Sequence, residues 1–152
     1  MTLRVWLRLL TSAQLIERHI RSLLRREFDT TLPRFDVLAQ LDASNGVLSM
    51  GELSERLMVT SGNVTGLIDL MEEDGLVERV PHPTDRRSTL IQMTARGEKL
   101  FSQTVPAHQN WVHEIMADLT NEELRELHRL LGKVKTSALD LRVGQGRGAR
   151  ER

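Results

Sequence analysis

The stretch Ser49–Thr94 constrains the fold most strongly, because two short amphipathic segments are followed in it by two short β-prone runs. Ser49–Asp74 predicts two helices, the first ending near Val59-Thr60 and the second beginning at the turn Ser61-Gly62-Asn63. Leu76–Thr94 predicts a two-stranded hairpin whose loop carries Asp-Arg-Arg. A helix-turn-helix followed by a basic hairpin indicates a winged helix.

Two capping boxes and one glycine mark helix ends in the sequence. Ser49 and Glu52 stand three residues apart, as do Thr120 and Glu123, so each side chain can bond the other's free backbone N–H. Gly75 follows the second central helix, and glycine enters the left-handed region of the helix C-terminus without steric cost. The central helix pair and the last helix therefore have predicted boundaries.

Long helices are predicted on both sides of this core. Leu3–Phe28 repeats apolar residues at helical spacing, with arginines on the other side, and Pro33–Asp42 follows as a shorter helix. After the hairpin, Thr94 is placed to cap a helix over Ala95–Leu119, which Pro106 should kink. A last helix with a leucine-rich face follows the second capping box.

A winged-helix core leaves the first and last helices without an internal partner. A two-fold dimer explains their leucine-rich faces most simply, and packing within one chain is the alternative. We expect a single chain over 1–141, with 1–30 and 95–141 mainly as dimerisation helices and 31–94 as the winged-helix core. The Gly- and Arg-rich segment 142–152 should be a disordered basic tail. The expected fold class is mainly α, with a two-stranded β wing.

The composition excludes several classes of protein. The apolar fraction of 39% and the charged fraction of 28% are ordinary for a globular domain. The sequence has no cysteine, which excludes disulfides, thiolate metal sites and thiol redox switches. Arg4, Arg8 and Arg18 interrupt every apolar run near the N-terminus, so we expect neither a signal segment nor a membrane span, and a cytoplasmic location. No enzyme motif and no cofactor motif is recognisable.

The net charge is zero, which by itself argues against nucleic acid, because phosphate-binding surfaces usually show a basic excess. The distribution of charge is uneven, however. Acidic residues concentrate in Asp69–Glu78 and Glu114–Glu126, whereas arginines concentrate in the first helix, at Arg86 and Arg87, and after Arg142. The local field matters more than the sum of the charges.

The second central helix is predicted to expose a small, polar face. Its inner stripe consists of four apolar residues: Val64, Leu67, Ile68 and Met71. The N-terminal part of the helix then presents small or polar residues on the outside: Ser61, Gly62, Asn63, Thr65 and Gly66. Asn63 and Thr65 can hydrogen-bond base edges or phosphates, and the helix N-terminus offers free N–H groups to a phosphate.

Two features of this face have more than one interpretation. Gly62 and Gly66 each cost about 1 kcal/mol relative to alanine inside a helix. Close approach of the backbone to a DNA groove would compensate for that cost, and simple tolerance at an exposed site is the alternative. Asp69 is unfavourable beside phosphates, so its expected role is an ion pair.

The hairpin loop carries Asp85, Arg86 and Arg87. In an extended segment Asp85 and Arg87 lie on the same side, so the carboxylate can orient the guanidinium. An arginine held in this way suits a narrow minor groove, while Arg86 points towards the phosphate backbone. The alternative is a solvated turn with a local ion pair worth at most about 1 kcal/mol.

These residues together resemble the MarR family of transcriptional regulators. The motifs, which run in this order from Leu53 to Gly97, are Asn-Val-Thr-Gly-Leu-Ile-Asp, Gly-Leu-Val-Glu-Arg, His-Pro-x-Asp-Arg-Arg and Met-Thr-x-x-Gly. The resemblance implies a homodimer on a palindromic, double-stranded DNA operator, with Asn63 and Thr65 in the major groove and Arg87 at the wing tip. It also implies that a small ligand, often a phenolic or aromatic acid, relieves repression.

The sequence departs from the family pattern in two respects. Many members have arginine where this chain has Gly66 or Leu70, so more of the DNA contact is expected from the wing. Without cysteine, the thiol mechanism of peroxide-sensing members is excluded. No metal site is expected, because the histidines do not form a ligand cluster with carboxylates: His19, His82, His108, His113 and His128.

The family resemblance implies a ligand site between the dimerisation helices and the core. The residues that qualify by type are Trp6, His19, Arg34, His108 and Trp111. Trp6 and Trp111 fall on apolar stripes that usually form core or dimer packing, and a histidine on such a face usually satisfies a backbone group. For each candidate this second interpretation is the favoured one. The basic stretch that includes Arg18, Arg21, Arg25 and Arg26 is usually a solvated face, but Arg18 and Arg25 could bind the phosphates of an aromatic acyl-coenzyme A.

The sequence therefore predicts a ligand-responsive, DNA-binding repressor that acts as a homodimer. The alternative is a winged-helix protein-interaction module without sequence-specific DNA binding, which the neutral net charge and Asp69 keep open.

Overall fold

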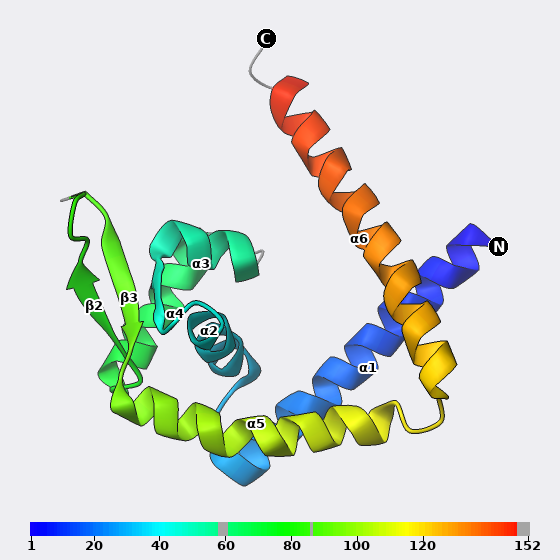
Figure 1. Cartoon of the computed structure of the whole chain (residues 1–152), viewed down its shortest axis with the longest axis horizontal. Helices are drawn as coiled ribbons and strands as arrows, with labels where there is room; N and C mark the ends of the chain where they lie inside the picture. Colours follow the sequence, from blue (N-terminus) through cyan, green and yellow to red (C-terminus); the bar gives the residue numbers. More distant parts are fainter. Residues whose placement is uncertain (58–60, 86, 149–152) are drawn as a thin grey trace. The chain divides into compact units, whose positions relative to one another are not determined.

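The computed structural model describes residues 1–57, 61–85 and 87–148 (Figure 1). The chain divides into two units, the first covering Met1–Trp111 and the second beginning at Val112. The elements are, in order, α1 (Thr2–Phe28), α2 (Leu32–Asp42), β1 (Val47–Ser49), α3 (Met50–Leu57), α4 (Ser61–Glu73), β2 (Val77–Pro81), β3 (Thr89–Met93), α5 (Ala95–Ile115) and α6 (Asn121–Gly148). The predicted end of the first central helix at Val59-Thr60 lies outside the described residues.

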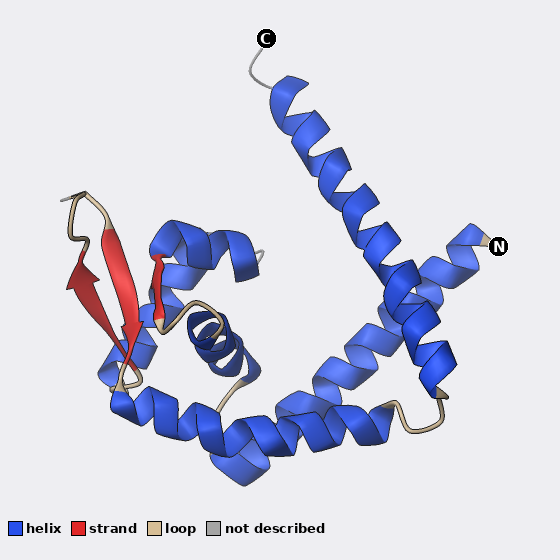
Figure 2. Ribbon diagram, viewed as in Figure 1, coloured by secondary structure: helices blue, strands red, loops and turns tan. Residues whose placement is uncertain are grey.

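A three-stranded antiparallel sheet lies beside the central helices, and its strand order is β1-β3-β2 (Figure 2). In the hairpin, Arg79 pairs with Ile91, and on the other side of β3, Leu48 pairs with the same Ile91. The sequence predicted a sheet of only two strands. It missed β1 because three residues are too few to show a period of two.

The core forms between α2, α3, α4 and one face of the sheet. Its buried members include the predicted inner residues Val64, Ile68 and Met71, which are fully buried, while Leu67 is partly buried against them. From the hairpin, alternate residues Val77 and Ile91 contribute to the same core. The apolar residues at helical spacing in α4 and the alternate residues of the hairpin strands therefore pack in one apolar cluster.

The capping hydrogen bonds predicted from the sequence are present at the helix ends. The Ser49 backbone N–H donates to Glu52 Oε2 at 2.8 Å, and the Glu52 N–H donates to Ser49 Oγ at 3.2 Å. Thr120 and Glu123 form the same pair of bonds at 2.8 and 3.3 Å. Gly75 has a φ of +70° after α4, as predicted from the left-handed helix end. These hydrogen bonds confirm both capping boxes.

Thr94 and Gly97 join the start of α5 to the base of the hairpin. Thr94 Oγ1 accepts from the Gly97 N–H at 3.1 Å and donates to the Gly75 carbonyl at 2.6 Å. A methyl group on Gly97 would lie only 2.2 Å from the Leu76 carbonyl oxygen. Glycine is therefore required here for the helix to lie directly against the turn that leaves α4.

The long helices differ from the sequence prediction at their ends. α5 ends at Ile115 rather than Leu119, and Pro106 lies inside it. The helical backbone of α6 continues to Gly148, into the segment that the sequence predicted as a disordered tail from Arg142. Adding residues to an existing helix costs much less than starting one, and composition alone does not capture this effect.

Apolar side chains remain exposed on both long terminal helices of the single chain. On α1 the exposed group includes Leu3, Trp6 and Leu7, each more than half exposed. On α6 it includes Leu130 at 45% and Val134 at 53%. No helix within the described residues is long and apolar enough to span a bilayer.

Candidate nucleic-acid interface

The N-terminal half of α4 forms an exposed face of small and polar residues. Gly62, Asn63, Thr65 and Gly66 are all exposed, as the inner apolar stripe requires. A methyl group placed on Gly62 or on Gly66 would have no atom within 4 Å. Packing inside the chain therefore does not explain either glycine, and both interpretations from the sequence, close approach to a DNA groove and simple tolerance at an exposed site, remain open.

Asp69, on the same face, is held in an ion pair, as predicted. Arg79 of β2 donates from Nη2 to Asp69 Oδ1 at 2.5 Å and from Nη1 to Glu72 Oε2 at 2.5 Å. The Arg79 backbone N–H also donates to Glu72 Oε1 at 3.0 Å. One guanidinium thus bridges two carboxylates and ties the hairpin to α4.

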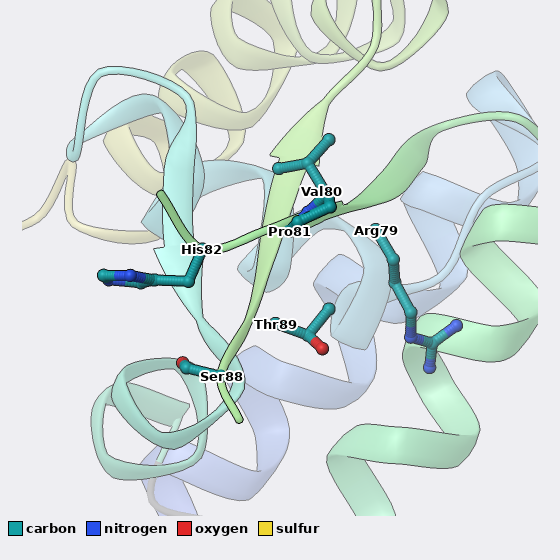
Figure 3. Close-up of a pocket in the computed structure, with 6 residues that line it drawn as sticks. All are labelled: Arg79, Val80, Pro81, His82, Ser88 and Thr89. Carbon is teal, nitrogen blue, oxygen red and sulfur yellow. The ribbon is translucent and has the colours of Figure 1, made fainter. Parts of the chain in front are cut away.

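Figure 3 shows the Arg79 side chain leaving the hairpin on the opposite side from His82 and Ser88. Burial alone lowers the pKa of the Arg79 guanidinium, but its hydrogen bonds to Asp69 and Glu72 outweigh burial and raise that pKa. The arginine therefore stays charged and neutralises acidic groups beside the polar face of α4. The sequence motif Gly-Leu-Val-Glu-Arg contained Arg79, but nothing in the spacing predicted its partners.

The wing, defined here as β2, β3 and residues 82–88, is held at its tip by two side chains. His82 Nδ1 accepts the backbone N–H groups of Thr84 at 3.2 Å and Asp85 at 3.0 Å. Asp85 Oδ1 accepts the backbone N–H of Arg87 at 2.9 Å. Sequence reasoning missed the role of His82, because a loop histidine gives no periodic signal.

The contact of Asp85 with Arg87 differs from the sequence prediction. We expected the carboxylate to orient the guanidinium, but it bonds the backbone N–H instead, because this bond closes a tight turn over two residues. The Arg87 side chain is exposed and has no ion-pair partner within the described residues. Arg86 lies outside the described residues, and for Ser61 only the backbone at the start of α4 is described.

The ligand-site candidates do not gather at one place in the first unit. Four of them are exposed on α1: Trp6, Arg18, His19 and Arg25. Trp111 is 8% exposed and packs edge-on against Phe28, with ring centroids 6.0 Å apart. His108 stacks on Phe35 at 4.5 Å, and burial lowers the pKa of His108. The packing interpretation therefore accounts for Trp111 and His108.

A carboxylate between α1 and α2 was not predicted. Burial raises the pKa of Asp36 to about 6, with a further increase from Glu17 and an opposing effect from Arg21. The sequence placed Asp36 on the short helix of Phe35 and Leu38 without assigning it to a face. A single half-buried acid near charged residues of another helix gives no motif.

The described part of the chain contains no group of three or more histidine, aspartate or glutamate side chains placed to hold a metal ion. The arrangement that it does contain is a polar helix face and a basic, hydrogen-bonded hairpin tip on one winged-helix core. Such a pair of elements suits the major groove and the adjacent minor groove or phosphates of a DNA duplex.

Comparison with known proteins gives the same assignment. The family model described as "MarR family" matches residues 28–88. The HTH-type transcriptional repressor YetL of Bacillus subtilis is 34% identical over 65% of this chain and 60% of its own length. A MarR mutant from E. coli complexed with operator DNA is 29% identical, with 83% of this chain and 89% of that chain covered and a TM-score of 0.77.

A second structure of the E. coli protein, the reduced form of MarR, is 30% identical. It covers 83% of this chain and 92% of that chain, with a TM-score of 0.70. Both the fold and the sequence of nearly the whole neighbour are therefore matched. The chain belongs to the MarR family of winged helix-turn-helix transcriptional regulators.

Proposed function

We propose that the chain is a homodimeric repressor that binds a palindromic operator through α4 and the wing. The observation that carries this proposal is the ion-pair bridge of Arg79, which neutralises Asp69 beside the polar face of α4. A free carboxylate at that place would repel phosphates, and the bridge removes this objection. YetL, whose name states that it is a repressor, supports the same direction of regulation.

Two-fold dimerisation is supported by the terminal helices. Leucine and valine side chains are exposed on α1 and on α6, and a matching face of a second copy would bury them. A dimer also places two α4 helices on one duplex, which a palindromic operator requires. Segments 1–30 and 95–141 are therefore the proposed dimerisation helices, and 31–94 is the proposed DNA-binding core.

For the effector, we propose a small aromatic acid or its coenzyme A thioester. The exposed basic residues Arg18 and Arg25 of α1 can bind carboxylate or phosphate oxygens, and both lack an ion pair within the described residues. Trp6 and His19 are exposed on the same helix and remain candidates for the aromatic part. A coenzyme A thioester would contact more of the basic residues of α1 than a free acid would. Calorimetric titration with both forms therefore tests the proposed effector.

The wing assignment is tested by Arg87→Ala, with Arg125→Ala on α6 as a matched control. Both side chains are exposed and neither forms an ion pair within the described residues. Arg87→Ala should weaken operator binding by about 1–3 kcal/mol in a fluorescence anisotropy titration, whereas Arg125→Ala should not.

The same titration separates the proposal from a winged-helix interaction module. A repressor should lose affinity steeply as salt rises, because phosphate contacts release counterions. An unchanged affinity of Arg87→Ala would refute the wing contact, and no salt-dependent binding to DNA flanking the chain's own gene would favour the interaction module.

A further inference from the structure

The imidazole of His82, at the tip of the wing, faces three hydrogen-bond donors of the loop that follows it. Its Nδ1 lies 3.0 Å from the Asp85 backbone nitrogen, 3.2 Å from the Thr84 backbone nitrogen and 3.4 Å from Thr84 Oγ1. A backbone N–H can only donate, so Nδ1 must carry a lone pair and the ring proton must lie on Nε2. The loop therefore requires one tautomer of the neutral imidazole.

The hydrogen bonds of His82 lead directly to the backbone of Arg87. The ring fixes the Asp85 backbone, and Asp85 Oδ1 in turn accepts the Arg87 N–H at 2.9 Å. The Asp85 carbonyl accepts the Ser88 N–H at 3.0 Å, and the Ser88 carbonyl accepts the His82 N–H at 3.4 Å. The position of Arg87 in the loop thus depends on the ring of His82.

Protonation of the ring is incompatible with these hydrogen bonds. Both nitrogens of an imidazolium are donors, so a protonated Nδ1 would face two backbone N–H groups with no lone pair to offer. Imidazole is the side chain whose ordinary titration falls between pH 5 and 8. A modest acidification can therefore remove the hydrogen bonds that hold Thr84 and Asp85.

One acidic group of another element lies near the ring. The pKa of Glu52, at the start of α3, is lowered mainly by its hydrogen bonds to Ser49. The charges of Arg56 and His82 lower that pKa further, so the imidazole lies within electrostatic reach of this carboxylate. A charged ring is repelled by the loop N–H groups and attracted towards α3, which favours its departure from the loop.

The other charged groups near the ring belong to the wing itself. Among the described residues of the loop, these are Asp85 and Arg87. Figure 3 shows that the imidazole and the Arg79 side chain leave the hairpin on opposite sides. The two carboxylates of α4 that bind Arg79 therefore do not face the ring. Glu52 and Asp85 are thus the acids, and Arg87 the base, that accompany its titration.

We propose that neutral His82 is the positioning residue of the wing, and that its protonation releases the loop and weakens operator binding. This inference rests on the proposed contact of Arg87 with the operator. A loop that is not fixed in advance must be ordered during binding, and this cost lowers affinity. The charge of the imidazolium acts in the opposite direction, because it attracts the phosphates of any sequence. Acidification should therefore weaken binding to the operator but not to a scrambled duplex.

The loop is tested first in the full chain without DNA, by a pH titration of the ¹⁵N-labelled protein. At pH 8 the ring nitrogens of His82 should show the Nε2–H tautomer. As the pH falls, the amide signals of Thr84 and Asp85 should shift with the same midpoint as the ring. Amide signals that do not follow the ring would overturn the release of the loop, as would an Nδ1–H tautomer.

His82→Asn separates the hydrogen bonds from the titration. The asparagine Oδ1 is as many bonds from the backbone as Nδ1, and asparagine commonly accepts the N–H groups that follow it in a turn, but it does not titrate. In this variant the amide signals of Thr84 and Asp85 should lose the pH-dependent shift. A shift that persists with the same midpoint would assign it to another group and overturn the role of His82.

Operator affinity is then measured by fluorescence anisotropy at pH 8 and pH 5.5, at constant ionic strength. The unchanged chain should bind about tenfold more weakly at pH 5.5, whereas His82→Asn should lose most of this response. His82→Ala, which has no acceptor, should bind weakly at both pH values. His113→Gln, which removes an exposed histidine of α5, should keep the response of the unchanged chain. An equal fall in the unchanged chain and in His82→Asn would overturn the positioning role.

Arg87→Ala shows whether His82 acts through that arginine. If it does, Arg87→Ala should bind weakly at both pH values and lose most of the pH response, and a full response in this variant would overturn the proposed route. Absence of operator binding at every pH refutes the proposed function instead. The amide titration of the free chain then decides by itself whether His82 holds the loop.

Discussion

The exposed glycine Gly66 allows stability and DNA binding to be separated in one substitution. Gly66 lies in the interior of α4, and a methyl group there would meet no atom within 4 Å. Gly66→Ala should therefore gain the full helix preference of alanine, about 1 kcal/mol, without a packing cost. For a chain of this size the melting temperature should rise by about 2–4 °C.

The effect on DNA depends on why glycine is present. If the α4 backbone approaches the groove closely, the added methyl group collides with the DNA, and operator affinity should fall by about tenfold, or 1.4 kcal/mol. We therefore expect Gly66→Ala to combine higher stability with weaker operator binding. Stability is measured by thermal unfolding at a fixed protein concentration, because dimerisation makes the melting temperature depend on concentration. Affinity is measured by fluorescence anisotropy.

Gly132→Ala provides the matched control, because its added methyl group also meets no atom within 4 Å. Helical spacing places Gly132 on the side of α6 opposite Leu127, Leu130 and Val134, the exposed apolar residues proposed for the dimer. This substitution should raise stability in the same way and leave operator affinity unchanged. If Gly66→Ala binds the operator as tightly as the unchanged chain, the glycine is merely tolerated and close approach of the backbone is refuted. A fall in stability for Gly66→Ala would refute the open space around it.

Three further tests use substitutions elsewhere in the first unit. Gly97→Ala should destabilise the fold by about 2–4 kcal/mol, because its methyl group would lie 2.2 Å from a backbone carbonyl, and a denaturation midpoint equal to that of the unchanged chain would contradict the close approach. Arg79→Gln should weaken operator binding about tenfold, because it leaves two carboxylates unpaired. Adding Asp69→Asn should restore part of the operator affinity. If the double variant binds no better, the charge of Asp69 is not the cause of the loss. Asp36→Asn should raise stability at pH 7.5 but have little effect near pH 4. The pKa of Asp36 is about 6 in the folded chain and lower in the unfolded chain, so the charged carboxylate destabilises the fold as pH rises from about 4 to 6. A stabilisation that is the same at both pH values, measured as the difference from the unchanged chain, would contradict the burial of that carboxyl group.

The sequence predicted those parts of the fold that depend on local rules. Both capping boxes, the glycine after α4 and the buried stripe of that helix follow from spacing alone, and the structure confirms them. The ion pair of Asp69, predicted because a free carboxylate is unfavourable beside phosphates, was also confirmed. The partner Arg79 was not predictable, since it stands ten residues away and on another element.

Features that depend on tertiary contact were missed for a common reason. β1 is a strand only because β3 pairs with it, and His82 has a structural role only because the loop brings the backbone N–H groups of Thr84 and Asp85 to its Nδ1. Periodicity and capping rules act over a few residues, so none of these contacts leaves a local pattern.

Hydroxyl-radical footprinting on the DNA upstream of the chain's own gene tests the central claim most directly. If a dimer places its two α4 helices in successive major grooves, two symmetric protected regions should appear about one helical turn apart, roughly 10 base pairs. Protection at the outer edges should be lost in Arg87→Ala while the central pattern remains. A single unsymmetric protected region, or none at concentrations where the chain is folded, would contradict a dimeric, operator-binding regulator.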